Sequence, residues 1–267
     1  MYTNYQYCRP FLGVSLMTTY AGTGSGCPGV QLNKYLAHAG VTSRRDAVRM
    51  IGSGDVRVNG EVVREPGHRV MSGDVVELRG KPIACERKVY LLLNKPKDFV
   101  TTCADERGRR TVVSLLAGRV KQRVYPVGRL DRGTTGLLLL TNDGALANKL
   151  AHPRYGVEKR YAVTLDKPLT NDDVLRIKRG VRLFDGVVKV DSLRLSARRP
   201  TEVTIALHSG KNRVVRRLFE QLGYRVRKLD RIAYAGLRKQ GLPIGAWRPL
   251  TQEEVAQLSG ATRSRRY

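Results

Sequence analysis

The stretch GRLDRGTTGLLLLTNDG, residues 128–144, gathers in one short loop the residue types that could perform chemistry. Asp131 stands there between Arg129 and Arg132. A carboxylate can act as a nucleophile or a general base, and nearby cations favour its ionised form. An aspartate in a glycine-rich loop can also simply form a turn. The residues alone therefore leave catalysis and turn formation open.

The glycines of this loop do not form a phosphate-binding loop. Gly128 and Gly133 have four residues between them, but Thr134 and Thr135 follow where such a loop requires Lys and then Ser or Thr. Nucleotide hydrolysis is therefore not expected. The four leucines at 137–140 predict a buried strand that anchors the loop.

The charge of the whole chain indicates a polyanionic partner. Lys and Arg number 49 against 23 Asp and Glu, which gives a net charge of +26 over 267 residues. Nucleic acid is the expected partner rather than a membrane, because no apolar run approaches the roughly 20 residues of a spanning helix. With 41% apolar residues, the chain has the composition of a globular protein.

The cysteines and histidines predict neither a metal site nor a disulfide framework. The four cysteines are scattered without a C-x-x-C pair, and none of the four histidines lies near them in ligand-like spacing. We expect a cytoplasmic protein without metal or small-molecule cofactor. Residues 1–29 lack the pattern of a signal peptide and are expected to form a flexible extension, and 259–267 a basic tail.

Residues 30–80 predict a small α/β domain. Ser43 and Asp46 resemble a capping box at the start of a helix whose Ala47, Val48 and Ile51 would face inward. Asn59-Gly60 predicts a hairpin between two short strands. Basic side chains on the helices are candidate RNA contacts, although they could equally only solvate the surface; they are Lys34, Arg44, Arg45 and Arg49.

A linker is expected at 81–87 and a second domain at 88–258. Strands are predicted at 89–93, 123–127, 136–141, 161–165, 187–195 and 202–208, and helices at 144–151, 170–179, 212–222 and 251–258. The connections are mostly too short for repeated βαβ crossovers. We therefore expect an α+β fold with a mixed, largely antiparallel sheet flanked by helices.

Two resemblances extend this interpretation. The small domain resembles the RNA-binding domain first known from ribosomal protein S-four. The loop motif closely resembles the catalytic motif of pseudouridine synthases, in the subfamily that carries an S-four-like domain and modifies bacterial ribosomal RNA. The similarity recurs in LLLNKPKDFVTT, HPRYGVEKRYAVTL, SGKNRVVRRLFEQLGYRVRKLDRIAYAGL and LPIGAWRPLT.

The resemblance implies isomerisation of uridine to pseudouridine, without cofactor, on a nucleotide extracted from the RNA stack. Asp131 matches the essential aspartate of the family. It could attack the anomeric carbon of ribose, attack carbon 6 of the base, or take a proton from ribose carbon 2. These three routes stay open.

Other residues receive roles from the same resemblance. Arg216 corresponds to the cation that would hold Asp131 in a bidentate contact, and Tyr161 to the tyrosine that stacks on the target base. Arg129 would enter the space left by the extracted base or contact its phosphates. Val214 departs from the family pattern, in which glutamine is usual. Expected RNA-backbone contacts are Lys95, Lys97, Lys211, Asn212 and Arg213.

The motifs look most like those of enzymes acting on 23S RNA, with a 16S enzyme as the near neighbour. The substrate could be naked RNA or a ribosome-assembly intermediate, and we expect a monomer. A non-catalytic RNA-binding or ribosome-assembly factor of the same fold is the alternative. Glycoside or nucleoside hydrolysis usually requires two carboxylates flanking the bond, whereas Asp131 has only basic neighbours among the charged residues nearest in sequence.

Overall fold

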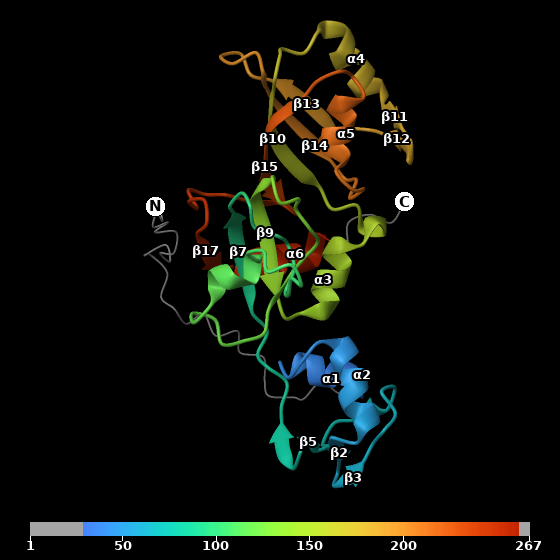
Figure 1. The fold of residues 1–267 in the computed structure, drawn as a ribbon. Helices are drawn as coiled ribbons and strands as arrows, with labels where there is room; N and C mark the ends of the chain where they lie inside the picture. Colours follow the sequence, from blue (N-terminus) through green and yellow to red (C-terminus); the bar gives the residue numbers. More distant parts are fainter. Residues whose placement is uncertain (1–28, 262–267) are drawn as a thin grey trace. The chain divides into compact units, whose positions relative to one another are not determined.

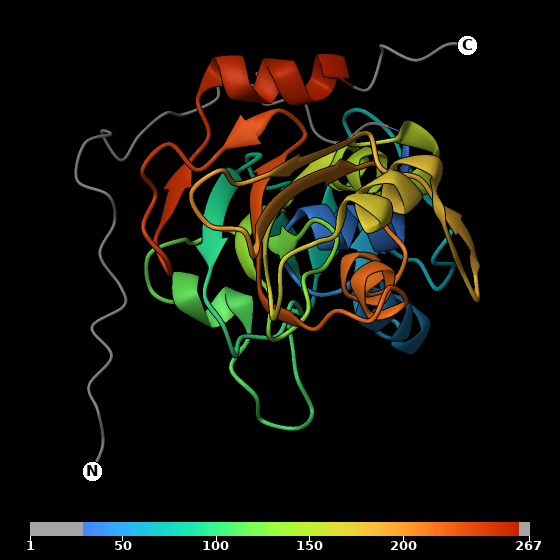
Figure 2. The same ribbon diagram turned by 90° about the horizontal axis from the view of Figure 1, so that it is seen from above.

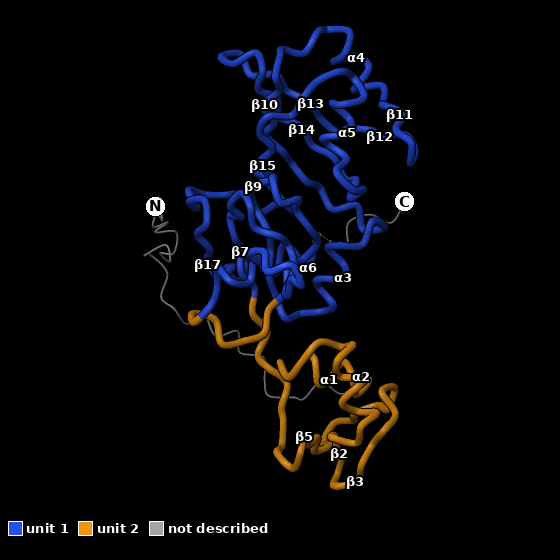
Figure 3. Tube along the Cα trace, in the orientation of Figure 1, with its two compact units in different colours: residues 1–16, 90–117, 125–267 blue, residues 17–89, 118–124 orange. Residues whose placement is uncertain are grey.

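The computed structural model describes residues 29–261. They form two compact units, shown in Figure 3: a small unit of residues 29–89 with 118–124, and a large unit of residues 90–117 with 125–261. The flexible extension expected at 1–29 lies almost wholly outside the described residues, and the basic tail expected at 259–267 lies mostly outside them.

The small unit packs two helices against short strands (Figure 1). Its elements are β1 (Val30–Gln31), α1 (Leu32–His38), α2 (Arg44–Ser53), β2 (Val56–Val58), β3 (Glu61–Val62), β4 (Arg69–Val70), β5 (Val76–Leu78) and β6 (Lys81–Ile83). The Asp46 amide donates to the Ser43 hydroxyl at 3.2 Å, which confirms the cap of α2. Asn59 and Gly60 have φ of 53° and 83° and connect β2 to β3, which confirms the hairpin.

Two expectations for the small unit are wrong. Val48 is 41% exposed, because Ala47 and Ile51 lie one helical turn apart and define a core-facing stripe that Val48 does not share. Residues 81–83 do not start a linker, because they form β6 and pair with β5. Pro82 is compatible with this position because β6 is the edge strand of its sheet.

The large unit is built on a nine-stranded sheet with the order β13-β14-β10-β15-β9-β7-β17, to which β8 and β16 add short pairings. The strands are β7 (Tyr90–Lys95), β8 (Tyr125–Pro126), β9 (Thr135–Thr141), β10 (Lys159–Leu165), β13 (Ser192–Leu195), β14 (Glu202–Leu207), β15 (Val226–Tyr234), β16 (Leu237–Arg238) and β17 (Trp247–Pro249). All pairings are antiparallel except that of β9 with β15. The expected mixed, largely antiparallel sheet is confirmed.

Helices cover this sheet. They are α3 (Gly144–Ala151), α4 (Asn171–Arg179), α5 (Val214–Glu220) and α6 (Gln252–Ala261), with 3-10 turns η1 (Val112–Leu116) and η2 (Pro153–Tyr155). In Figure 2, α6 lies on the outside of the large unit. Arg248 of β17 holds the start of α6 by donating two 2.7 Å hydrogen bonds to the Glu254 carboxylate. This bidentate contact holds α6 against the edge strand β17.

The sequence pattern missed the longest strand. β15 carries Arg227, Lys228, Asp230 and Arg231, so it lacks the apolar run of a buried strand. The expected strand 187–195 is also wrong in part, because it divides into β12 (Gly186–Val188), which pairs with β11 (Val181–Leu183), and β13, which belongs to the main sheet.

The parallel pairing of β9 with β15 depends on Gly136. This residue has φ +111°, and a Cβ there would lie 2.4 Å from the backbone nitrogen and oxygen of Arg231. Only glycine permits this approach of the two backbones. The loop that contains Asp131 therefore enters the sheet at a point where two strands lie unusually close.

Candidate active site

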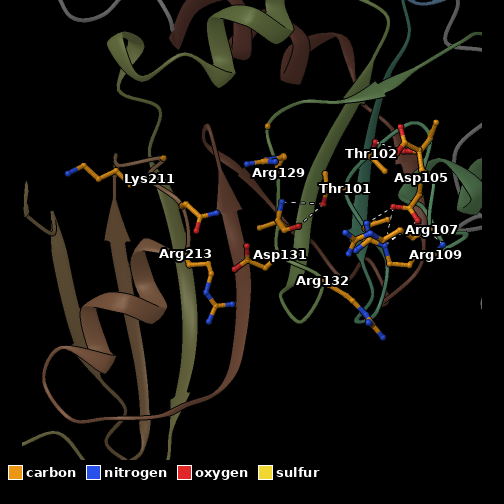
Figure 4. Close-up of a pocket in the computed structure, with 17 residues that line it drawn as sticks. Thr101, Thr102, Asp105, Arg107, Arg109, Arg129, Asp131, Arg132, Lys211 and Arg213 are labelled. Atoms are coloured by element: carbon orange, nitrogen blue, oxygen red, sulfur yellow. Dashed lines mark hydrogen bonds and ion pairs between the residues drawn. The ribbon is translucent and has the colours of Figure 1, made fainter. Parts of the chain in front are cut away.

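The loop between β8 and β9 holds Asp131 by its backbone. Thr101 donates its hydroxyl to the Leu130 carbonyl at 2.7 Å and accepts from the Leu130 amide at 3.2 Å. The Thr134 amide donates to the Asp131 carbonyl at 3.0 Å, which closes a turn directly after the carboxylate. Two of these contacts are dashed in Figure 4. They involve the backbone of the loop, and the half-buried side chain of Asp131 lines the two cavities described below.

Lys95 lies beneath this loop and is fully buried. Its ammonium donates to the carbonyls of Thr134 at 2.8 Å, Pro96 at 3.0 Å and Arg132 at 3.4 Å. Burial lowers the pKa of Lys95 to about 8, against the opposing attraction of Asp98 and Asp131. The expected RNA contact of Lys95 is therefore wrong: the end of β7 passes under the loop, and this cation holds loop carbonyls instead.

An inner cavity of about 130 Å³ opens beside Asp131. Tyr161 of β10, 8% exposed, lines it, as expected for a residue that could stack on a base. Apolar side chains supply much of the rest of the wall: Leu150, Val214, Val215, Leu229 and Tyr234. Val214, which departs from the family glutamine, thus contributes apolar surface. The Asp131 carboxylate and the Tyr161 ring therefore line one cavity whose wall is otherwise largely apolar.

Two cations in this wall were missed by the sequence analysis, namely Lys159 and Arg231. Lys159 donates to the carbonyls of Val157 at 3.0 Å and His208 at 3.1 Å, and burial lowers its pKa to about 8. Arg231 is 2% exposed and donates from Nε to the Leu137 carbonyl at 2.7 Å. Lys159 could have been suspected from its position two residues before Tyr161, on the same face of a strand. The sequence pattern offers no comparable indication for Arg231, because it does not predict the strand β15 that carries this residue.

Arg216 lies near the loop but not in the expected contact. Its guanidinium donates to the carbonyls of Val226 at 3.1 Å and Gly133 at 3.3 Å. Among the residues that the structure describes, no ion pair joins it to Asp131, so the expected bidentate contact is not formed. Burial lowers the pKa of Arg216, and Asp131 acts on it in the opposite direction through space. Arg216 thus fixes the end of the loop and contributes positive potential.

An outer cavity of about 640 Å³, shown in Figure 4, is also lined by Asp131. Arg129 is exposed and lines both cavities. Basic side chains from three loops line the outer cavity: Arg107, Arg109, Arg129, Arg132, Lys211 and Arg213. Asn212 also lines it, whereas Lys97 is exposed and lies outside both cavities. The outer cavity therefore has the charge expected for a phosphate backbone.

Several of these cations already have partners. The Lys211 ammonium donates to the Asp185 carbonyl and lies 3.6 Å from its carboxylate. Arg213 lies 3.7 Å from Glu220, and Arg109 contacts Asp105 at 2.5 Å. An incoming polyanion would have to share or replace these contacts.

The basic candidates of the small unit lie on its helices. Arg44, Arg45 and Arg49 are exposed on α2, and Lys34 is half-buried on α1. Arg49 pairs with Asp46 one turn earlier. The arginines therefore present a cationic helix face to solvent.

The described residues, 29–261, offer neither a metal-binding cluster nor a membrane-spanning helix. They contain no group of three or more His, Cys, Asp or Glu side chains arranged to hold a metal ion. Within the same part of the chain, no helix is long and apolar enough to cross a membrane.

Comparisons with protein families match both units. The model described as RNA pseudouridylate synthase matches residues 89–221, and the S4 domain model matches residues 30–76. The matches include the S-four-like segment and the motif around Asp131, whereas part of the motif at 209–237 and the whole motif at 242–251 lie beyond the matched residues.

Individual relatives match over most of the chain. Ribosomal large subunit pseudouridine synthase B of Bacillus subtilis is 43% identical over 85% of this chain and 95% of the relative. Dual-specificity RNA pseudouridine synthase RluF of Escherichia coli K12 is 39% identical over 86% of this chain and 78% of the relative. A crystal structure of a pseudouridylate synthase is similar with a TM-score of 0.61 and 27% identity, covering 86% of this chain and 99% of the other.

Proposed function

This chain belongs to the RNA pseudouridine synthase family, with an S4 domain before the synthase domain, and on that premise we propose that it converts uridine to pseudouridine in large-subunit ribosomal RNA, with Asp131 as the catalytic residue. One observation carries the assignment of Asp131: it contributes the only carboxylate among the residues that line the inner cavity. Support for the substrate comes from the relative named for the large ribosomal subunit.

The inner cavity is the proposed site of the extracted base. A uridine must leave its RNA stack before an enzyme can reach the bond between ribose and base. Tyr161 offers a ring on which the uracil stacks, a contact worth about 1 to 3 kcal/mol for a base on an aromatic side chain. The apolar wall around the ring excludes water and retains the base after it is detached.

Asp131 acts on the nucleoside from the mouth of this cavity. Asp131 lies close enough to Lys95 and Arg216 to interact with both cations through space. The carboxylate attacks the anomeric carbon, attacks carbon 6 of the base, or removes the proton from ribose carbon 2. None of these routes consumes an oxidant or an external energy source, since substrate and product are isomers.

The outer cavity and the S4 domain are the proposed RNA-binding surfaces. Arg129 lies at the border of both cavities and is placed to contact the phosphates of the target nucleotide or the space that its base leaves. Lys211, Asn212 and Arg213 line the outer cavity, where phosphate contacts would position the strand without specifying its sequence. We propose that one chain is the working unit.

The proposal is tested by tritium release from ribosomal RNA labelled at uracil carbon 5. Wild-type protein and Asp131→Asn are compared on protein-free 23S and 16S transcripts, and the RNA affinity of both proteins is measured in parallel. We expect release from 23S RNA by the wild type only, a loss of at least about 10²-fold for Asp131→Asn, and similar affinities.

Each other outcome contradicts a named part of the proposal. Release from 16S RNA alone would overturn the large-subunit substrate, and substantial turnover by Asp131→Asn would overturn the role of the carboxylate. RNA binding without release from either transcript, in protein-free form or in assembly particles, would favour a non-catalytic ribosome-assembly factor.

A further inference from the structure

Two cations in the inner cavity, the buried Arg231 and the half-buried Lys159, have no carboxylate partner. Among the described residues, no acidic side chain forms an ion pair with Lys159 or Arg231. Arg231 has, in addition, a buried Nη2 group without a hydrogen-bond partner, although the residue is only 2% exposed. An unpaired buried guanidinium N–H is costly, so a native protein that retains one usually uses it.

A β-bulge brings these groups to one face. In the pairing of β10 with β15, Arg160 lies opposite Ala233 but Tyr161 lies opposite Arg231, so Ile232 is the extra residue. Without the bulge, Arg231 and Tyr234 would point to opposite faces of the sheet, because they are three residues apart. Here the Arg231 guanidinium lies over the Tyr234 ring, 4.5 Å from its centre, and both residues line the cavity.

The charges of the cavity are therefore unbalanced without a ligand. Lys159 and Arg231 carry two positive charges in a largely buried wall, and Asp131 supplies the single carboxylate. Lys211 and Arg213, which also line the cavity, have their own acidic partners in Asp185 and Glu220. Arg129 is exposed to solvent, which screens its charge. The inner wall thus favours a ligand that brings one additional negative charge.

We infer that Lys159 and Arg231 bind the uracil base as an anion at the stage when it is detached from ribose. This inference rests on the proposed function and deepens it, by assigning two residues to the departing base in addition to those that act on ribose. The ligand class is a planar heterocycle whose negative charge is shared between a ring nitrogen and two carbonyl oxygens.

The chemistry of the two ribose routes produces this anion. The bond from ribose C1′ to N1 breaks and its electron pair stays with the base, giving uracil one negative charge. At the same time, C1′ forms a bond to an Asp131 oxygen, or Asp131 takes the C2′ proton and a C1′–C2′ double bond forms. C5 of the rotated base then bonds to C1′, and Asp131 leaves as carboxylate or returns the proton to C2′. The C5 proton then passes to water and N1 takes a proton from water, which leaves the base neutral.

The positions of the two cations suit the rotation of the base. Their charges act on an anion through space in either orientation, whereas a neutral donor would have to be realigned with each carbonyl. Stabilisation of charge that appears only during the reaction accelerates the chemical step. Loss of either cation should therefore slow bond cleavage more than it weakens RNA binding.

The test compares uridine with 5-fluorouridine at the target position. Fluorine withdraws electrons, so the departing base carries its negative charge more easily and depends less on nearby cations. Single-turnover loss of the target nucleoside is followed by liquid chromatography and mass spectrometry of digested RNA, for Lys159→Met and Arg231→Met. We expect a loss of about 10²-fold on uridine and of less than about 10-fold on 5-fluorouridine.

Matched controls remove the same charge outside the cavity. Arg160→Met changes the neighbour of Lys159 on β10, and Arg227→Met changes an exposed residue on β15; neither residue lines a cavity. Both controls should act as the wild type on either substrate. Lys159→Arg and Arg231→Lys keep the charge and should recover much of the rate on uridine, which also provides folded variants if a methionine variant is unstable.

The outcomes separate this inference from the proposed function. Equal losses on both substrates would indicate a structural role for the cations and would overturn the inference, as would no loss on uridine. Wild-type protein that isomerises neither substrate would instead contradict the proposed function itself.

Discussion

The arginines of α2 and the cations of the inner cavity carry the same charge, but the former are exposed to solvent and the latter lie in a cavity wall. Arg44, Arg45 and Arg49 extend into solvent from a helix of the S4 domain. Lys159 and Arg231 lie in a cavity wall, where burial lowers the pKa of Lys159 to about 8. A solvated cation costs little to maintain and attracts RNA at any sequence. A buried cation costs stability, and we expect it to act on a reacting group rather than on the phosphate backbone.

Lys95 extends this comparison to the loop that contains Asp131. It is fully buried although Lys97, two residues later, is exposed. One lysine of the NKPK motif therefore holds the loop, and the other remains available to RNA. The two lysines differ in burial because of their positions at the end of β7. Composition and net charge do not reveal such a difference.

The largest effect is expected where the cavity wall meets the loop. Gly136→Ala should lower the free energy of unfolding by about 3 kcal/mol or more and abolish measurable activity, because its Cβ would collide with the Arg231 backbone. Urea unfolding and tritium release measure both effects. Gly133→Ala is the control in the same loop, since the atom nearest to its Cβ is 3.9 Å away. Equal stability of the two variants would refute the proposed close approach.

Comparing Lys95→Met with Lys97→Met should distinguish the role of the buried lysine from that of its exposed neighbour. The variant leaves loop carbonyls without their donor, which should cost about 1 to 3 kcal/mol of stability and reduce kcat by about 10-fold or more. Lys97→Met should leave kcat unchanged and weaken RNA binding slightly. Initial rates under multiple-turnover conditions at saturating RNA give kcat for both variants. A larger loss of kcat in Lys97→Met than in Lys95→Met would reverse the roles assigned to the two lysines.

The pH dependence of stability should distinguish buried from solvated cations. Lys95 and Lys159 have pKa values of about 8 in the fold, below the ordinary 10.5. Between these values the unfolded chain binds more protons than the folded one, so the free energy of unfolding should rise with pH. The slope should approach 1.4 kcal/mol per pH unit for each lysine.

Urea titrations at pH 7.5 and 9.5 measure this rise. Lys95→Met should lose about half of it, whereas replacement of the three α2 arginines should leave it unchanged. An identical rise in Lys95→Met and wild type would show that Lys95 keeps its ordinary pKa.

The smallest effect on turnover is expected from the S4 domain. Replacing Arg44, Arg45 and Arg49 together by Gln should weaken ribosomal RNA binding and reduce the slope of log K against log salt by up to about 3, with kcat nearly unchanged at saturating RNA. Filter binding at several salt concentrations gives the slope. A fall in kcat at saturation with an unaltered slope would assign these arginines to the chemistry rather than to docking.

The sequence allowed the framework of the fold to be predicted, including the capped helix after Ser43, the Asn59-Gly60 hairpin and the helix at 144–151. These features depend on local turn chemistry and on apolar periodicity, which are visible in a short window. Asp131 and Tyr161 were placed by resemblance, and the structure brings both to one cavity.

The remaining features could not be read from the sequence because they depend on pairing between distant segments. β15 has charged residues where a buried strand usually has apolar ones, and its Arg231 shares a face with Tyr234 only through the bulge at Ile232. In the sequence, Lys95 has the pattern of a surface lysine, because its burial depends on the distant loop at 128–134, whose Thr134 carbonyl accepts from its ammonium. The expected contact between Arg216 and Asp131 failed because carbonyls of Gly133 and Val226 accept from this guanidinium.

The parallel pairing of β9 with β15 also sets the order in which the protein can become active during its synthesis. The Thr135 hydroxyl donates to the Asp230 carboxylate at 2.7 Å, across 95 residues of sequence. Closing a segment of that length is slow compared with forming the local helices and hairpins. A nascent chain that ends before β15 contains Asp131 but lacks Leu229, Arg231 and Tyr234, so it has no complete inner cavity. The ribosome therefore has to release most of the synthase domain before the Asp131 carboxylate lies in a complete cavity.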